Sequence, residues 1–161
     1  MNMLLGDKVD GNEVPCLLLP ITKDRLLLPT VTIAEMIPYR PPQSKLKEEA
    51  PDWFLGELLW RGLIIPMLSF EKISGREQSP VNQNSQIAIF NNTGVSAQLP
   101  FFAISTTGIP RLNRITPDGI QPNENNSPNN YEIMQVDIDG QRAIIPNVPA
   151  LERACVELLH L

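Results

Sequence analysis

Proline and glycine interrupt this chain so often that it has little room for long helices. The 161 residues include 16 prolines and nine glycines. Proline removes a backbone hydrogen-bond donor and ends helices, while glycine favours turns. The pattern therefore predicts short strands joined by turns, within one domain or one domain of two lobes.

The bulk composition excludes several classes of protein. The hydrophobic fraction is 42%, the mean hydropathy is −0.10 and the formal net charge is −5, which are ordinary values for a globular protein with a core. The sequence has no run of Lys and Arg that could bind the phosphates of a nucleic acid. Every apolar run is too short and too interrupted for direct membrane insertion. Residues 1–13 lack a basic stretch followed by an apolar core, so we expect a cytoplasmic protein without a secretory signal.

The first third of the chain predicts a hairpin followed by two short helical turns. Val14–Thr22 and Arg25–Val31 are apolar runs around a polar turn, and they predict two strands. Thr32–Ile37 begins with the spacing of a capping box, which predicts the start of a helix. Pro51–Phe54 predicts a second short helix.

Two further hairpins are predicted in the middle and last parts of the chain. Gly56–Leu59 and Leu63–Phe70 flank Arg61-Gly62, and this arrangement predicts the first. Tyr131–Asp139 alternates in polarity and runs into Asp139-Gly140, a strong turn signal. The alternation places Gln135, Asp137 and Asp139 on one solvated face. The remaining predicted elements are strands at Gln86–Phe90, Leu99–Ser105 and Arg142–Ile145, and an amphipathic helix from Val148 to Leu161.

Three segments are predicted to be mobile loops. They cover about residues 40–50, 75–85 and 121–130. The first is charged, and the other two are rich in Asn, Gln, Ser and Pro, so none has enough apolar surface to order itself.

No constellation of catalytic or metal-binding residues stands out. A nucleophilic cysteine needs a base, but His160 is the only histidine and both Cys16 and Cys155 lie among aliphatic residues. The acidic pairs Glu48-Glu49 and Asp137/Asp139 fall in a charged loop and on a solvated face, where carboxylates are poor general acids. The sequence therefore predicts a binding module without metal or cofactor rather than an enzyme.

One segment carries a specific resemblance. Pro51-Asp52-Trp53-Phe54-Leu55-Gly56, then Arg61-Gly62, then Ile64–Leu68, resembles the signature of CheW-like domains, in which a P-x-x-x-x-G turn precedes a strand, an Arg-Gly hairpin and a second strand. Ile33-Ala34-Glu35-Met36 is similar to the V-x-E-I segment of that family. The resemblance is collinear over nearly the whole chain.

The resemblance implies a fold and a function. It implies one CheW-like domain over residues 1–161, mainly β, with two SH3-like five-stranded β-barrel lobes packed together, short helices and a C-terminal helix. It also implies a non-enzymatic adaptor that couples the regulatory domain of a CheA-type histidine kinase to the cytoplasmic tip of methyl-accepting chemoreceptors. Such a protein is cytoplasmic and is recruited to the inner face of the membrane through receptor arrays.

The chain also departs from the family pattern. Leu59-Trp60 stands before Arg61, where the family usually has Asn and a small aliphatic residue. Together with Trp53, this departure resembles ChpC-type members, which serve chemosensory systems of type IV pili and twitching motility. The chemosensory system is therefore expected to control type IV pili, and the alternative is a system that controls flagella.

Eight residues are candidates for partner binding. Arg61 is either a solvated turn residue or a binding residue whose guanidinium donates hydrogen bonds to a partner. Gly62 is expected to adopt the positive φ that the turn requires. Trp53 and Trp60 are either interface anchors or core. The other candidates, which lie in the V-x-E-I-like segment, are Ile33, Glu35, Met36 and Ile37.

Ile64, Ile65 and Leu68 are expected in the core. Two other classes of function stay open on the sequence. One is a small β-barrel enzyme or ligand-binding protein, which requires a deep polar pocket. The other is a structural oligomer, with weak self-association through Trp53 and Trp60.

Overall fold

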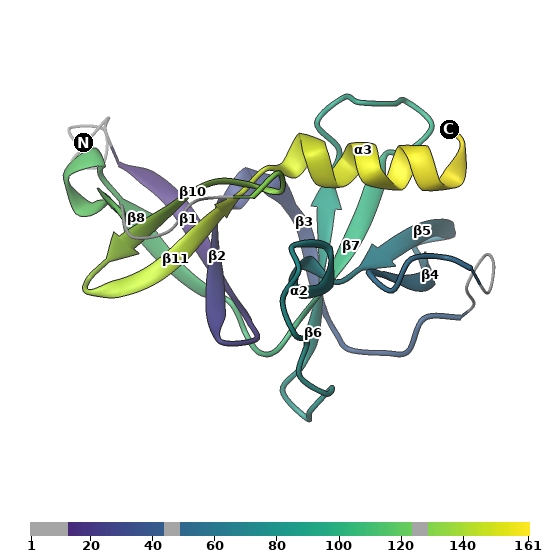
Figure 1. The fold of residues 1–161 in the computed structure, drawn as a ribbon, viewed down its shortest axis with the longest axis horizontal. Coiled ribbons are helices and arrows are strands. Elements are labelled where there is room, and N and C mark those ends of the chain that lie inside the picture. Colours follow the sequence, from purple (N-terminus) through teal and green to yellow (C-terminus); the bar gives the residue numbers. More distant parts are fainter. Residues whose placement is uncertain (1–12, 44–48, 124–128) are drawn as a thin grey trace, which may run out of the picture.

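Two β-sheets form the two lobes of the molecule (Figure 1). The structure, a computed structural model, describes residues 13–43, 49–123 and 129–161. Lobe 1 takes the beginning and the end of the chain, and lobe 2 takes the middle.

Lobe 1 is a six-stranded sheet in the order β8-β1-β2-β11-β10-β9. Its strands are β1 (Val14–Ile21), β2 (Asp24–Pro29), β8 (Arg111–Ile115), β9 (Gln121–Pro122), β10 (Glu132–Ile138) and β11 (Gln141–Pro146), with the 3-10 helix η2 (Pro117–Gly119) between β8 and β9. The sheet is antiparallel except where β11 runs parallel to β2. The two predicted hairpins of this lobe are confirmed.

Lobe 2 is a five-stranded sheet in the order β3-β6-β7-β5-β4. Its elements are the 3-10 helix η1 (Thr30–Thr32), β3 (Ile33–Pro38), β4 (Phe54–Trp60), β5 (Leu63–Leu68), α2 (Phe70–Ile73), β6 (Gln86–Asn91) and β7 (Phe101–Thr106). The chain after β3 folds back along β4, where the Gln43 amide donates to the Glu57 carbonyl at 2.7 Å. This contact links the segment that follows β3, one edge strand of the sheet, to β4, the other edge strand.

The predicted C-terminal helix is present as α3 (Val148–Leu159). It follows the last strand of lobe 1 and lies along lobe 2 in Figure 1. The buried carboxylate of Glu152 holds it there, because it accepts hydrogen bonds from the Thr93 amide at 2.6 Å, the Thr93 hydroxyl at 2.8 Å and the Val95 amide at 3.0 Å.

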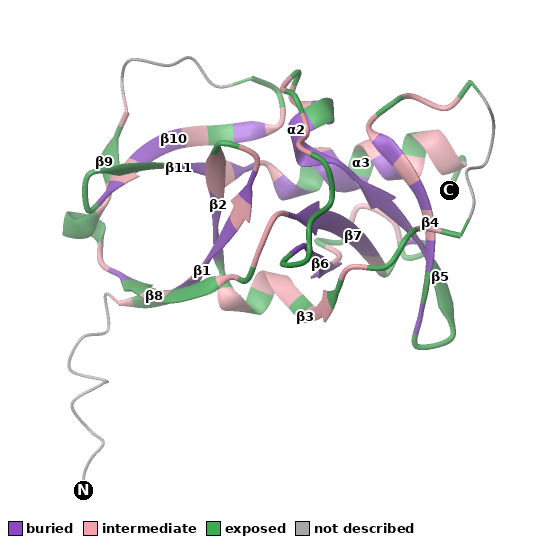
Figure 2. Cartoon of the chain, turned by 90° about the horizontal axis from the view of Figure 1, so that it is seen from below, coloured by how far each residue is buried: buried purple, intermediate pink, exposed green. Residues whose placement is uncertain are grey.

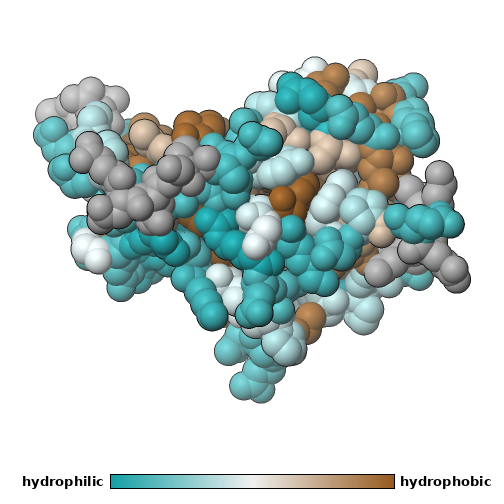
Figure 3. Space-filling view, viewed as in Figure 1, coloured by the Kyte–Doolittle hydropathy of each residue, from teal (hydrophilic) through white to brown (hydrophobic). Residues whose placement is uncertain are grey.

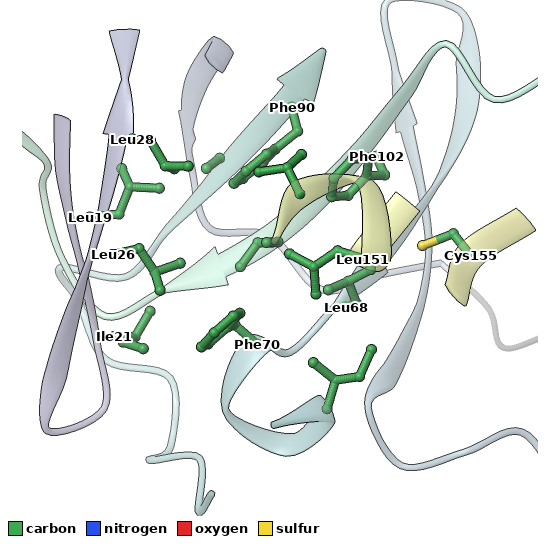
Figure 4. Close-up of a cluster of buried hydrophobic side chains, with 14 of the residues drawn as sticks. Leu19, Ile21, Leu26, Leu28, Leu68, Phe70, Phe90, Phe102, Leu151 and Cys155 are labelled. Atoms are coloured by element: carbon green, nitrogen blue, oxygen red, sulfur yellow. The ribbon is translucent and has the colours of Figure 1, made fainter. Parts of the chain in front are cut away.

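A single hydrophobic core joins the two lobes. Side chains of β1 and β2 point toward side chains of lobe 2 and of α3, as Figure 4 shows. Fully buried members include Leu19 and Leu26 from lobe 1, Phe90 and Phe102 from lobe 2, and Leu151 from α3. Each such side chain contributes roughly 1.5–3 kcal/mol on burial, so the lobes stabilise one another. The centre of the boundary between the lobes is therefore apolar.

Two buried glutamates add polar contacts across the lobes. The Glu71 carboxylate at the start of α2 accepts hydrogen bonds from both the amide and the hydroxyl of Thr22, each at 2.9 Å. Glu132 of β10 pairs with Arg76 at 2.5 Å. Removing either partner would leave a buried polar group unsatisfied, so these contacts fix how the lobes sit on one another.

Two of the predicted helices are wrong. Thr32–Ile37 does not begin a helix, because Ile33–Pro38 is strand β3, whose residues pair with β6 from Ile33↔Phe90 to Pro38↔Gln86. Pro51–Phe54 forms a turn, closed by a hydrogen bond from the Phe54 amide to the Pro51 carbonyl at 3.0 Å, and the chain continues directly as β4. Sheet pairing overrides the local capping signal in the first case.

The structure also contains a short helix where we predicted the end of a strand. Leu63–Phe70 was expected to be extended throughout, but β5 ends at Leu68 and α2 begins at Phe70. The Ser69 hydroxyl caps this helix by accepting a hydrogen bond from the Lys72 amide at 3.1 Å.

The expected solvated face of β10 is solvated only in part. The register of β10 on β11 shifts at a bulge between Glu132 and Met134, and from Met134 to Ile138 it is continuous. Gln135 is buried where its side-chain amide donates to Glu132 at 2.8 Å, and Asp137 is half-buried with a hydrogen bond from Asn123, while Asp139 is exposed at the turn.

The mobility predicted for three loops stays a prediction. Residues 44–48 and 124–128, which include Glu48, lie outside the described residues. Within the third loop the short strand β9 pairs with β10. The 75–85 loop contains no strand or helix, and its Ser79 amide donates to the Thr22 hydroxyl at 2.9 Å.

The surface is mostly hydrophilic on the face shown in Figure 3, with small hydrophobic groups between the polar ones. Among the described residues, no helix is both long enough and apolar enough to cross a membrane.

Candidate functional site: the tip of the β4–β5 hairpin

The two-residue turn between β4 and β5 has an unusual backbone. Arg61 and Gly62 both have positive φ, 49° and 79°, as a type I′ hairpin turn requires. The positive φ expected at Gly62 is therefore confirmed, and a Cβ there would meet no atom within 4 Å, so backbone conformation alone favours glycine. Arg61 has a side chain in the same left-handed region, which costs about 1 kcal/mol for a residue other than glycine.

Glu35 fixes the direction of the Arg61 side chain. The Nε and Nη2 atoms of Arg61 lie 3.2 and 3.1 Å from Oε1 of Glu35, which is on β3. The same oxygen accepts a hydrogen bond from Nε1 of Trp60 at 2.9 Å. One carboxylate oxygen thus joins the end of β4 to β3, the opposite edge of the sheet.

The Arg61 guanidinium is held on one side and open on the other. Its carbon lies 5.2 Å from the centre of the Trp60 ring, within the range of a cation–π contact. The Arg61 side chain is nevertheless 69% exposed. A guanidinium has five N–H donors, and Glu35 engages only two of its nitrogens, so donors remain directed at solvent.

Trp60 supports this arrangement from inside the lobe. Its ring is buried, and it packs edge-on against Phe101 with centroids 4.8 Å apart. This placement leaves little of the ring for a second chain. Trp60 therefore acts as a positioning residue for Arg61.

Exposed hydrophobic side chains flank the turn on both strands of the hairpin. The hairpin register pairs Leu59 with Ile64 and Trp60 with Leu63. Ile64 is 65% exposed, and Leu59 and Leu63 are exposed as well. The tip of the hairpin is correspondingly exposed in Figure 2. We call Leu59, Arg61, Leu63 and Ile64 the hairpin tip.

The exposure of Ile64 corrects a prediction. Ile65 and Leu68 are buried as expected, but Ile64 is on the outer face of the barrel. Strand alternation was the signal that could have found it, since a two-residue turn at Arg61-Gly62 fixes the register and places Leu59 and Ile64 opposite to Leu58 and Ile65.

The remaining candidates lie away from this cluster. Ile33 and Met36 of β3 and Trp53 before β4 are half-buried and pack against the core between the lobes. Ile37 is half-buried against the core of lobe 2. The structure thus brings together Glu35, Trp60, Arg61 and Gly62, places Ile37 against the core cluster that contains Trp60, and leaves Ile33, Met36 and Trp53 at the inter-lobe core.

Neither cysteine has the surroundings of a nucleophile. Burial raises the pKa of the Cys16 thiol. Burial, with a smaller contribution from the Glu152 charge, raises the pKa of the Cys155 thiol to about 12. Within the described part of the chain, no group of three His, Cys, Asp or Glu side chains is placed to hold a metal ion.

The molecule thus has two β-barrel lobes on one shared core, with a fixed cation beside exposed apolar side chains, a combination typical of protein-interaction surfaces. A solved structure has the same architecture: the scaffolding protein TtCheW from Thermoanaerobacter tengcongensis matches with a TM-score of 0.70 and 16% sequence identity, over 84% of each chain. The predicted fold of two SH3-like lobes is thereby confirmed.

The family model of the CheW-like domain matches residues 15–155. The chain therefore belongs to the CheW-like domain family, and it shares the fold of the scaffolding protein TtCheW. A search of curated proteins found no match.

Proposed function

We propose that this protein is a non-enzymatic adaptor that couples a CheA-type histidine kinase to methyl-accepting chemoreceptors. The observation that carries the proposal is the family match over residues 15–155. In this role the adaptor contacts the regulatory domain of the kinase and the cytoplasmic tip of the receptor, and it works in the cytoplasm at the inner face of the membrane. Neither the kinase nor the receptor requires a cofactor from this chain.

We place one partner contact at the hairpin tip. Arg61 offers charge-assisted hydrogen bonds to a partner carboxylate, and the exposed Leu59, Leu63 and Ile64 offer apolar area around it. Arginine is one of the residues enriched at interface hot spots. The rigid contacts to Glu35 and Trp60 lower the entropy that Arg61 loses on binding.

The backbone of the turn supports the same role. A type I′ turn favours Asn or Asp at the position of Arg61, because these residues tolerate positive φ. The exposed ion pair with Glu35 contributes about 0–1 kcal/mol, which is at most comparable to that cost. Arginine at this position is therefore better explained by binding than by turn formation.

The test is a reconstitution with three purified components. A receptor cytoplasmic fragment is sedimented with the kinase regulatory domain, with and without this protein. We expect the regulatory domain to sediment with the receptor only when the adaptor is present. Failure of the adaptor to bind either component would refute the proposal. Sedimentation of the adaptor alone measures self-association and so tests the oligomer alternative.

We further propose that the output is type IV pilus motility. The support is the Leu59-Trp60 departure from the family pattern, since Leu59 is on the exposed face and changes the surface offered to a partner. Deletion of the gene in its own bacterium should reduce twitching and leave swimming intact. Loss of swimming with normal twitching would assign a flagellar output instead.

A further inference from the structure

An apolar cavity opens at one end of the lobe 1 barrel. Its volume is about 290 Å³. The strands of lobe 1 form a ring in Figure 2, and the cavity lies where β1 begins and where β2 and β8 end. Its walls include Cys16, Leu27, Ile115, Thr116, Ile120 and Ile145. All of its lining residues belong to lobe 1, so the cavity is separate from the hairpin tip.

The side chains that line the cavity favour an apolar ligand. The hydroxyl of Thr116 and the thiol of Cys16 are the only side-chain polar groups on the described lining, and no lining residue is charged. A charged or strongly polar molecule would lose its hydration there without gaining partners. Water is poorly held for the same reason, and apolar cavities of this kind take up apolar molecules instead.

We propose that this cavity is a binding site for a small apolar organic molecule. Its volume is roughly twice that of the 150 Å³ cavity that accommodates benzene. A two-ring aromatic compound or a short alkyl chain fits this space, whereas a helix or a strand of a partner does not. This site is additional to the adaptor function and does not depend on it.

The ligand would contact the strand that joins the lobes. Leu27 of β2 lines the cavity, while its neighbours Leu26 and Leu28 point the other way into the core between the lobes. A ligand in the cavity therefore packs against the face of β2 that is opposite to the inter-lobe core.

The probe for the test is naphthalene, added to the full-length protein and followed by NMR. We expect saturable shifts of the amide signals of Cys16, Leu27 and Ile115 and of the methyl signals of Leu27 and Ile115, with no shift at Leu68 in the inter-lobe core. The two cysteines give an independent readout with methyl methanethiosulfonate. Cys16 should react slowly and be protected by naphthalene, whereas Cys155, fully buried in the inter-lobe core, should not react in the folded protein.

A matched pair of variants completes the test. Ile120→Trp fills the cavity, and Ile109→Trp makes the same change at an exposed position outside it. We expect Ile120→Trp to weaken naphthalene binding at least tenfold and Ile109→Trp to leave it unchanged, with both folds checked by circular dichroism. Absence of saturable binding, shifts that map elsewhere, or no protection of Cys16 in the wild-type protein would each overturn the proposal, even if Ile120→Trp fails to fold.

Discussion

The protein contains two hairpins with the same turn and different chemistry. In lobe 1, Asp139 and Gly140 join β10 to β11 with φ values of 51° and 78°. In lobe 2, Arg61 and Gly62 join β4 to β5 with φ values of 49° and 79°. Asp-Gly is a preferred sequence for this turn, and Arg-Gly is not.

The strands beside the two turns differ as well. The residues after Gly140 are the exposed Gln141 and Arg142, whereas those after Gly62 are the exposed Leu63 and Ile64. The lobe 1 hairpin thus has the composition that turn formation and solvation favour, and it serves as an internal reference. The residues of the lobe 2 hairpin that depart from it are the ones we assign to partner binding.

The largest expected effect comes from reversing the charge at the lobe 2 turn. Arg61→Glu should weaken assembly with the partner that contacts the hairpin tip by about 2 kcal/mol, roughly 30-fold, because a hot-spot cation becomes an anion beside Glu35. The control is Lys23→Glu, which reverses an exposed cation at the β1–β2 turn, also at positive φ. Sedimentation with each partner measures both. Equal losses for the two variants would mean that charge reversal at Arg61 has no effect specific to the hairpin tip.

Removing an apolar side chain beside Arg61 should have a smaller effect. Ile64→Gln is expected to weaken the same assembly by about 1 kcal/mol, several-fold, with an unchanged melting temperature, since Ile64 is exposed in the free protein. Leu112→Gln makes a comparable change at an exposed position of β8 in lobe 1. We expect no loss of assembly from this control. A fall in melting temperature without a fall in affinity would assign Ile64 to folding.

Placing arginine in the reference turn should cost stability alone. Asp139→Arg recreates in lobe 1 the sequence of the lobe 2 turn, and we expect it to lower the free energy of unfolding by about 1 kcal/mol without affecting assembly. Urea denaturation measures the change. A variant as stable as the wild type would mean that arginine carries no cost in this turn.

The smallest expected effect concerns the support of Arg61. Trp60→Phe keeps an aromatic ring against Phe101 but removes the hydrogen bond to Glu35, so we expect a loss of about 1 kcal/mol or less in stability. The NMR signal of Arg61 Nε should also broaden or shift. If it does not, Trp60 does not position Arg61.

The sequence predicted the strands better than the helices. The hairpins at Arg61-Gly62 and Asp139-Gly140 were correct because short turns with glycine fix strand pairing locally. Ile33–Pro38 was mistaken for a helix because its strand conformation comes from pairing with β6, more than 50 residues away in the sequence (Ile33↔Phe90). The bulge at Glu132 is likewise a property of the pairing and not of the local sequence.

The candidate site was predicted in part. The resemblance singled out Glu35, Trp60 and Arg61, but only the folded chain places them in one cluster, because Glu35 and Trp60 are on opposite edges of the sheet. The exposure of Leu59 and Ile64 was within reach of the sequence through the hairpin register. The apolar cavity of lobe 1 was not, since its walls come from four separate segments of the chain.

Replacing Arg61 with asparagine tests most directly whether the lobe 2 hairpin serves binding rather than turn formation. Asparagine suits positive φ, so Arg61→Asn separates the two roles. Two quantities are measured on one sample: the melting temperature, and the dissociation constant for the partner that contacts the hairpin tip. We predict a melting temperature equal to or above that of the wild type, together with binding at least tenfold weaker. Unchanged binding to both the kinase domain and the receptor fragment would contradict the account and leave Arg61 as a turn residue only.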